Sequence, residues 1–227
     1  MGAPLLEARG ITRSYGSFEA LAPVDLSFAR GERVALTGPN GAGKTTMLTI
    51  LAGVQAPSAG TLQWAGGSPA KVGWVPQRPA LYPRLTTREN LRLFAGLEGS
   101  DDPPATADEL IRRADLGDFA DRRAGALSTG TMQRLNLAIA LAGAPSLLLL
   151  DEPTGTLSPD QRVRLWQWLA DLVRSEDMAL VFSTQSIEEA ARHADRVLVL
   201  ARGRLVHDGP AGALDEESFM ALLGDEA

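Results

Sequence analysis

The sequence predicts an α/β fold in which a mainly parallel sheet is covered by helices on both faces. In the last third of the chain, apolar strand-like runs alternate with amphipathic helical patterns, which is typical of parallel sheets. One run, Leu147–Leu150, contains only leucine, as a strand buried on both faces requires. Between about residues 78 and 145 the pattern is mostly helical instead, which predicts a helical insert in the α/β core.

Composition limits the classes of protein to which the chain can belong. With 227 residues, 44% of them hydrophobic and 22% charged, it can bury a sizeable core. Cysteine is absent, which excludes disulfides, thiolate metal sites and a cysteine nucleophile. A net charge of −6 argues against nucleic-acid binding, so no nucleic-acid partner is expected. The longest apolar stretch, residues 137–150, is broken by Pro145, and no secretory signal is visible, so a cytoplasmic location is expected.

Short strands bounded by glycine or proline dominate the first part of the chain. They are predicted at Leu5–Thr12, Val24–Phe28, Arg33–Leu36, Thr61–Trp64 and Val72–Val75. After Thr86, apolar residues recur at helical spacing, and residues 99–104 form a surface loop. Two further helices are predicted near Asp108–Ala114 and from about Gly130 to Leu141.

The second part runs strand, helix, strand, helix, strand. After Leu147–Leu150, Pro159 opens a helix as its first residue, and Ser158 is its N-cap. Strands follow at Ala179–Ser183 and Arg196–Ala201, and the acidic run at residues 215–217 opens a last helix.

Residues 38–45, Gly-Pro-Asn-Gly-Ala-Gly-Lys-Thr, match the phosphate-binding loop G-x-x-x-x-G-K-[ST]. The loop follows a predicted strand and opens a helix, as the motif requires. Its glycines let consecutive N–H groups point at an anion together with the positive end of the helix. Lys44 then reaches the β- and γ-phosphates of a nucleotide, and the Thr45 hydroxyl is a ligand for Mg²⁺. The rival dinucleotide-binding pattern G-x-G-x-x-G is broken at Thr46.

Two carboxylates, Asp151 and Glu152, follow the four-leucine strand. Alone, such a pair reads as two solvated acids at a strand end. With a phosphate-binding loop in the same chain, Asp151 is placed to hold Mg²⁺ and Glu152 to orient or deprotonate an attacking water. The two motifs together therefore predict a nucleotide-hydrolysing site.

The chain resembles the ATP-binding cassette (ABC) family over nearly its whole length, because six further features occur in that family's order. These are Tyr15 as the adenine-stacking aromatic, Gln77 as the Q-loop glutamine, Leu127–Thr131 as the signature, Asp151 and Glu152 as the metal-site and catalytic carboxylates, Gly155–Ser158 as the D-loop, and Ser183–Gln185 at the switch histidine.

The resemblance implies a set of site residues. The residues expected to bind ATP are Tyr15, Asn40, Gly41, Gly43, Lys44, Thr45, Thr46, Gln77, Ser128 and Gly130. Those expected to hold Mg²⁺ are Thr45, Gln77 and Asp151, and those expected to act in catalysis are Lys44, Glu152 and Gln185.

The resemblance also implies an architecture and partners. Residues 1–227 would form one ABC ATPase domain, with a P-loop NTPase core at about 1–77 and 146–227, an N-terminal antiparallel β subdomain, and a helical subdomain at about 78–145. Two cassettes, as a homodimer or a heterodimer, would sandwich two ATP molecules head to tail. They would drive membrane permease subunits on separate chains, at the inner face of the cell membrane. Residues 81–91 look most like the stand-alone subunits of bacterial exporters.

Three motifs depart from the family pattern. In the signature, Thr129 replaces a glycine and Thr131 replaces the usual glutamine or glutamate. Ser158 replaces the D-loop aspartate, and Gln185 replaces the switch histidine. Gln185 can donate a hydrogen bond to a γ-phosphate but cannot carry a proton. Because Glu152 is present, we expect slowed rather than abolished hydrolysis. In a homodimer both sites would carry these changes.

Two hypotheses follow. In the first, the chain is an ATP-hydrolysing motor subunit of an exporter, which the intact Glu152 favours. In the second, it is a nucleotide-gated module with little turnover, which Thr129, Ser158 and Gln185 favour. Family members that act on ribosomes or DNA form a third class, but the chain has neither a second cassette nor a long coiled-coil insert.

Overall fold

The structure is a computed structural model of the chain, and it describes residues 4–67 and 70–224. Its strands are β1 (Leu6–Tyr15), β2 (Phe18–Phe28), β3 (Arg33–Thr37), β4 (Ala59–Trp64), β5 (Val72–Val75), β6 (Leu147–Leu150), β7 (Ala179–Thr184), β8 (Arg196–Ala201) and β9 (Arg204–Pro210). Its α-helices are α1 (Lys44–Leu51), α2 (Thr87–Leu97), α3 (Pro103–Arg113), α4 (Thr129–Ala140), α5 (Pro159–Glu176), α6 (Ile187–His193) and α7 (Glu216–Gly224).

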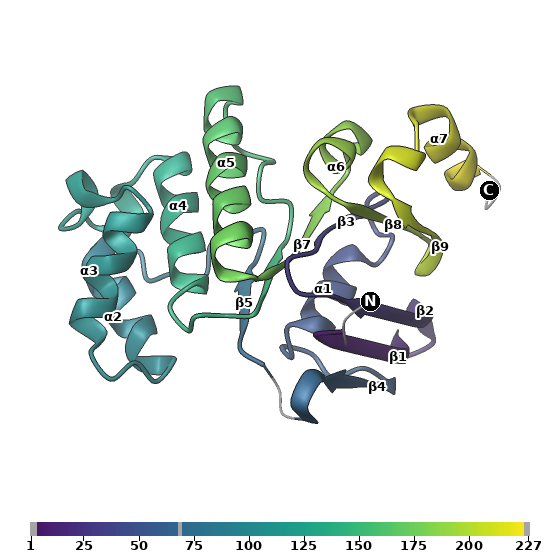
Figure 1. Cartoon of the computed structure of the whole chain (residues 1–227), viewed down its shortest axis with the longest axis horizontal. Helices are drawn as coiled ribbons and strands as arrows, with labels where there is room; N and C mark the ends of the chain where they lie inside the picture. Colours follow the sequence, from purple (N-terminus) through teal and green to yellow (C-terminus); the bar gives the residue numbers. More distant parts are fainter. Residues whose placement is uncertain (1–3, 68–69, 225–227) are drawn as a thin grey trace.

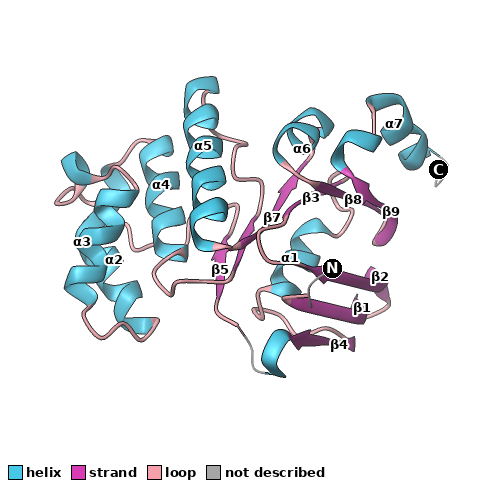
Figure 2. Ribbon diagram, in the orientation of Figure 1, coloured by secondary structure: helices cyan, strands magenta, loops and turns pink. Residues whose placement is uncertain are grey.

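Two sheets organise these elements (Figure 1). The larger has the order β5-β6-β7-β3-β8-β9, and all its neighbouring strands run parallel except β8 and β9. The smaller sheet is antiparallel, in the order β2-β1-β4. Helices α2, α3 and α4 gather at the end of the molecule opposite the smaller sheet (Figure 2). The predicted α/β class, with a mainly parallel sheet and an N-terminal antiparallel β sheet, is confirmed.

The central sheet separates two hydrophobic cores, and the alternation of side chains along β6 explains why. Leu148 and Leu150 face a core formed with α4, α5, α6 and the helical insert. Leu147 and Leu149 face the other core, formed with α1, β1 and β2. Successive residues of a strand point to opposite faces, so both faces of this strand must be apolar. The continuous leucine run is the sequence signature of that double burial.

Three local predictions need correction. Helix α3 begins at Pro103, inside the predicted surface loop, because the Asp102 side chain caps it and proline is tolerated in a first helical turn. Strand β2 begins at Phe18, earlier than predicted, because Gly16 at φ 61° turns the chain directly back from β1. For β9 no bounds were predicted, although His207 was expected to lie on a strand. Strand β9 follows a tight turn in which Arg202 and Gly203 both have positive φ, and its mixed polar sequence hides its bounds.

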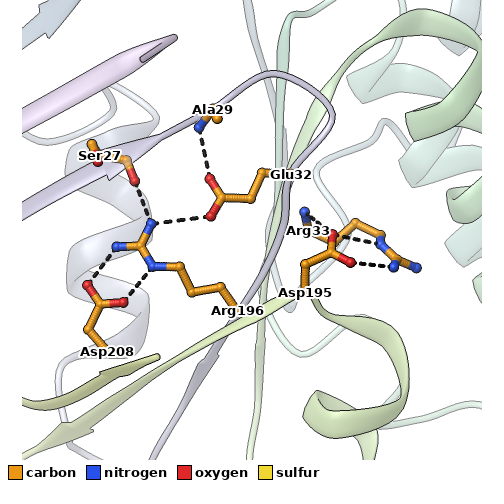
Figure 3. Close-up of polar contacts among 7 residues, drawn as sticks. All are labelled: Ser27, Ala29, Glu32, Arg33, Asp195, Arg196 and Asp208. Atoms are coloured by element: carbon orange, nitrogen blue, oxygen red, sulfur yellow. Dashed lines mark hydrogen bonds and ion pairs between the residues drawn. The ribbon is translucent and has the colours of Figure 1, made fainter. Parts of the chain in front are cut away.

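An arginine-carboxylate network joins β8 and β9 to the smaller sheet at the end of the central sheet where β3 and β8 begin (Figure 3). Arg33 binds Asp195 through two guanidinium nitrogens, with nitrogen–oxygen distances of 2.6 and 3.1 Å. Arg196 binds both carboxylate oxygens of Asp208, and it also donates to Glu32 and to the Ser27 carbonyl of β2. Bidentate pairs of this kind fix geometry as well as charge.

Candidate nucleotide site

The phosphate-binding loop runs from the end of β3 to the start of α1, and its backbone needs glycine. Gly38, Gly41 and Gly43 have φ of 142°, 79° and 104°. A Cβ at Gly38 would overlap the Leu200 carbonyl oxygen, and one at Gly43 would lie 2.8 Å from the Ala20 carbonyl oxygen. Both glycines are therefore required by packing as well as by conformation. Gly41 has no atom within 4 Å of a would-be Cβ, so the middle of the loop faces open space.

Lys44 is the first residue of α1 and is buried, with 6% of its surface exposed. Its ammonium group donates to the carbonyl oxygens of Gly38 at 2.8 Å and Pro39 at 3.0 Å. Burial lowers the pKa of Lys44, and the nearby carboxylates of Glu152 and Asp151 oppose that shift. The Lys44 ammonium group is thus desolvated and bonded to neutral carbonyl oxygens. An anionic oxygen would be a stronger partner for it than these carbonyls.

Asp151 lies directly after β6 and is 3% exposed. Its two carboxylate oxygens accept hydrogen bonds from the Thr45 hydroxyl at 2.8 Å and the Ser183 hydroxyl at 2.6 Å. Thr45 and Asp151, two of the residues expected to hold Mg²⁺, therefore meet although they lie 106 positions apart in the chain. Ser183 also accepts from the Glu152 backbone N–H at 2.8 Å.

Glu152 lies in the left-handed backbone region, at φ 47°, which is uncommon for a residue other than glycine. Each of its carboxylate oxygens accepts a hydrogen bond from a glutamine. Gln77 donates to Oε2 at 3.1 Å, and Gln185 donates to Oε1 at 2.9 Å. The predicted Q-loop and switch residues thus meet at the predicted catalytic carboxylate, and both present neutral amides to it.

Tyr15 projects from the end of β1 and is 47% exposed. Its hydroxyl bonds to the Gln55 amide at 2.9 Å, and the Arg13 guanidinium carbon lies 4.8 Å from its ring centroid. The Gln55 hydrogen bond lowers the pKa of Tyr15. The guanidinium group therefore lies over one face of this exposed ring. Asn40 is exposed and Thr46 is partly buried.

The predicted signature residues do not join this site within one chain. Ser128 caps α4, where its hydroxyl accepts from the Thr131 N–H at 3.3 Å. Gly130 is covered by Gln161 of α5, whose side chain occupies the space of a would-be Cβ. Helix α4 packs with α5 in the core on one face of the central sheet, whereas α1 packs in the core on the other face. The site within the chain therefore contains the loop, the two carboxylates and the two glutamines, and lacks Ser128 and Gly130.

The hydrogen bond from Ser183 to Asp151 and the packing of Gln161 on Gly130 were not predicted from the sequence. The parallel pairing of Leu150 with Phe182 places the next residues of both strands, Asp151 and Ser183, side by side. A polar residue at the end of a buried strand was the available signal for Ser183. Nothing in the sequence alone places Gln161 against Gly130.

The sequence model described as "ABC transporter" matches residues 21–155, which is more than half of the chain. The chain belongs to the ABC transporter family. It is the nucleotide-binding, ATPase part of such a transporter. None of the helices in residues 4–67 and 70–224 has the length and apolar character needed to cross a membrane.

Curated ABC relatives give the same assignment. The chain is 40% identical over 219 residues to a sulfate/thiosulfate import ATP-binding protein of Methylococcus capsulatus, covering 91% of this chain and 63% of that protein. It is 38% identical over 234 residues to a phosphonates import ATP-binding protein of Natronomonas pharaonis, covering 97% of this chain and all of that protein. Both names refer to import, so the prediction of an exporter is not supported.

A solved structure agrees with the ABC fold. The dimeric structure of a bacterial ABC transporter cassette superposes with a TM-score of 0.81 at 28% identity, over 91% of this chain and 98% of that one. The predicted ABC ATPase fold is thereby confirmed.

Proposed function

We propose that this cassette hydrolyses ATP at the site between the phosphate-binding loop, Asp151 and Glu152, and that it powers a membrane permease carried on separate chains. The observation that supports this most is the contact between the Thr45 hydroxyl and Asp151, beside a Glu152 carboxylate held by two amides. The phosphate-binding loop with α1 and the Glu152 carboxylate, a potential general base, lie at the same end of the central sheet, as phosphoryl transfer to water requires.

The donor set fits Mg²⁺. This ion prefers oxygen ligands and is usually held by one or two carboxylates together with substrate phosphates. The Thr45 hydroxyl and the Asp151 carboxylate lie 2.8 Å apart, and Gln77 reaches the same region through Glu152. We assign these three side chains to the metal, which when bound would neutralise charge on the β- and γ-phosphates.

The protein's own groups then divide the remaining work. The Lys44 ammonium exchanges the carbonyl oxygens of Gly38 and Pro39 for phosphate oxygens, a stronger charge-assisted contact. Glu152 orients a water and accepts its proton at a carboxylate oxygen. Gln77 and Gln185 fix the direction of that carboxylate. Tyr15 offers its exposed ring to the adenine base.

The signature supports a dimeric arrangement. Ser128 and Gly130 lie at the start of α4, where a helix N-terminus suits an anion, yet they lie outside the site of their own chain. We propose that they complete the site of a second cassette, head to tail, as a homodimer or a heterodimer. The relative solved as a dimer is consistent with this proposal. With a permease, the assembly would lie at the inner face of the membrane.

Steady-state Mg-ATP hydrolysis by the purified chain tests the proposal, with Glu152→Gln as the blank. We expect a rate clearly above the blank, and ATP-dependent dimerisation of Glu152→Gln on size exclusion. A wild-type rate equal to the blank would refute the motor function.

A second candidate function is a nucleotide-gated module with little turnover. The observation that favours it is the Gln185 amide on Glu152, because this residue can donate a hydrogen bond but cannot carry a proton as the expected switch histidine would. Tight ATP binding and dimerisation of the wild type, with a rate no higher than the blank, would favour this candidate.

A further inference from the structure

The carboxylate of Glu189, on α6, accepts hydrogen bonds from three side chains on three different elements. Oε1 accepts from the Thr154 hydroxyl at 2.7 Å and from the Trp166 indole N–H at 3.2 Å. Oε2 accepts from the Thr184 hydroxyl at 2.6 Å. Thr154 lies in the loop after β6, Trp166 on α5, and Thr184 at the end of β7. No other side chain in the described part of the protein joins these three elements in this way.

The start of α6 explains why this carboxylate is available. Ser186 caps the helix, and its hydroxyl accepts from the Glu189 N–H at 3.1 Å. A glutamate at this position of a helix often bonds back to the N–H of the capping residue. Here the Ser186 N–H donates instead to the Thr184 hydroxyl at 3.1 Å. Glu189 is thereby left to accept from the three other donors.

The two threonines flank the residues that meet at the site. Thr154 lies two positions after Glu152, and Thr184 directly precedes Gln185. Both threonines are 5% exposed, so neither hydroxyl has solvent as a substitute partner. Gln185 also lies between Thr184 and Ser186, and both are tied to Glu189. One carboxylate therefore fixes the backbone on both sides of the 2.9 Å contact between Gln185 and Glu152.

We propose that Glu189 is a positioning residue for ATP hydrolysis, which acts by holding Gln185 and Glu152 in register without touching nucleotide. This inference rests on the proposed function. None of its three partners belongs to the phosphate-binding loop, so ATP affinity is not expected to depend on Glu189. Its removal lets the Thr154 loop and the end of β7 move independently, and the Gln185–Glu152 contact loosens.

Glu189→Met, similar in length but without an acceptor, tests the proposal. We expect kcat to fall about tenfold, as for loss of a hydrogen bond to a charged group that matters in the transition state, while KM and ATP affinity stay within about twofold. Glu189→Gln, which keeps one acceptor oxygen, is expected to retain an intermediate kcat. The matched control is Glu188→Gln, because Glu188 is exposed on the same helix and pairs only with Arg192 among the described residues.

A double-mutant cycle with Gln185→Ala separates positioning from general stability. If Glu189 acts through the Gln185–Glu152 contact, Glu189→Met costs little further kcat once Gln185 is gone. Equal fold losses in both backgrounds, an unchanged kcat, or a parallel loss of ATP affinity would each overturn the proposal. If Glu189→Met fails to fold, Thr154→Val removes one donor to the same carboxylate and is expected to lower kcat alone. An unchanged kcat would refute the proposal.

The same assay distinguishes this proposal from the proposed function. A wild-type rate equal to that of Glu152→Gln would overturn both, since there would be no turnover to position. A wild-type rate above that blank, with an unaffected Glu189→Met rate, would overturn only the role of Glu189.

Discussion

Charged side chains lie at both ends of the central sheet but have different partners there. At the end where β3 and β8 begin, Arg33 and Arg196 saturate the carboxylates of Asp195 and Asp208 with bidentate contacts (Figure 3). At the opposite end, among the described residues, Lys44 donates to backbone carbonyls. Asp151 accepts hydrogen bonds from hydroxyls and Glu152 accepts them from amides.

This difference separates stability from function. Paired charges have nothing left to offer a ligand, and they stabilise the junction between the two sheets. Charges that have only neutral partners keep most of their attraction for an incoming anion, metal ion or proton. The fold therefore places charges that are paired with one another at one end of the central sheet. Charges with only neutral partners lie at the other end, where a nucleotide is proposed to bind.

The largest effect is expected for Glu152→Gln, at the end of the central sheet that carries the proposed nucleotide site. We expect kcat to fall roughly 10²- to 10⁴-fold, the usual contribution of a general base, with little change in ATP affinity or melting temperature. Steady-state kinetics and thermal unfolding measure both. A large fall in melting temperature together with the fall in kcat would contradict the separation of stability from function between the two ends of the sheet.

At the end where β3 and β8 begin, Arg196→Met is expected to lower stability without lowering kcat. It leaves Asp208 and Glu32 without their guanidinium, so the free energy of unfolding should fall by about 1–3 kcal/mol while kcat is unchanged. Urea unfolding and ATP hydrolysis measure the two effects. Arg204→Met, at an exposed arginine of β9, is the matched control. Equal destabilisation by both variants would mean that the network adds nothing specific.

Gln185→His tests whether a charged hydrogen bond at position 185 limits the rate of hydrolysis. A histidine can give the charged hydrogen bond that an amide lacks, so kcat should rise, by about tenfold if that bond is limiting. The variant should also gain a pH dependence near the ordinary histidine pKa of about 6.5. Rates measured between pH 5.5 and 8.5 check both expectations. Gln185→Ala is the comparison variant, and a rate above wild type for it would contradict the positioning role of the amide.

The smallest effect concerns Asp195, whose pKa the Arg33 guanidinium holds below the ordinary value of 3.8. A carboxyl with a lower pKa in the folded state stabilises the fold above its unfolded pKa, and loses that contribution as pH falls through the folded value. Asp195→Asn should therefore be slightly less stable than wild type at pH 7, and the gap should close below about pH 4. Urea unfolding at pH 7 and pH 3.5 measures the gap.

Asp118→Asn, at an exposed aspartate outside any ion pair among the described residues, controls for the loss of one negative charge. A gap that widened on acidification, or one that Asp118→Asn reproduced, would refute the assignment to the Arg33 pair.

The parts of the site that depend on local patterns were predictable. The phosphate-binding loop and the Asp151–Glu152 pair are contiguous motifs, and their meeting at one sheet edge follows from parallel strands. The contacts from Gln77 and Gln185 to Glu152 were not predictable from spacing, because they join three loops through space. Glu189, whose carboxylate contacts three other elements, carries no local sequence signal at all.

Elements of the fold were also predictable only where the local sequence leaves a single choice. The strand of four leucines could be predicted because burial on both faces leaves no alternative to apolar residues. The bounds of strand β9 could not, since an edge strand with one antiparallel neighbour tolerates polar residues. The start of α3 was missed because consecutive prolines usually indicate a break, whereas here they occupy the first helical turn.

The four leucines of β6 have a consequence for how the molecule comes apart. They contribute alternately to both hydrophobic cores, so neither core can be exposed to water without disturbing the strand that the other core shares. The two cores are thereby coupled across the central sheet, so we expect the opening of either core to disturb the other. Asp151 and Glu152 directly follow this strand, so they lie beside a segment that both cores hold in place.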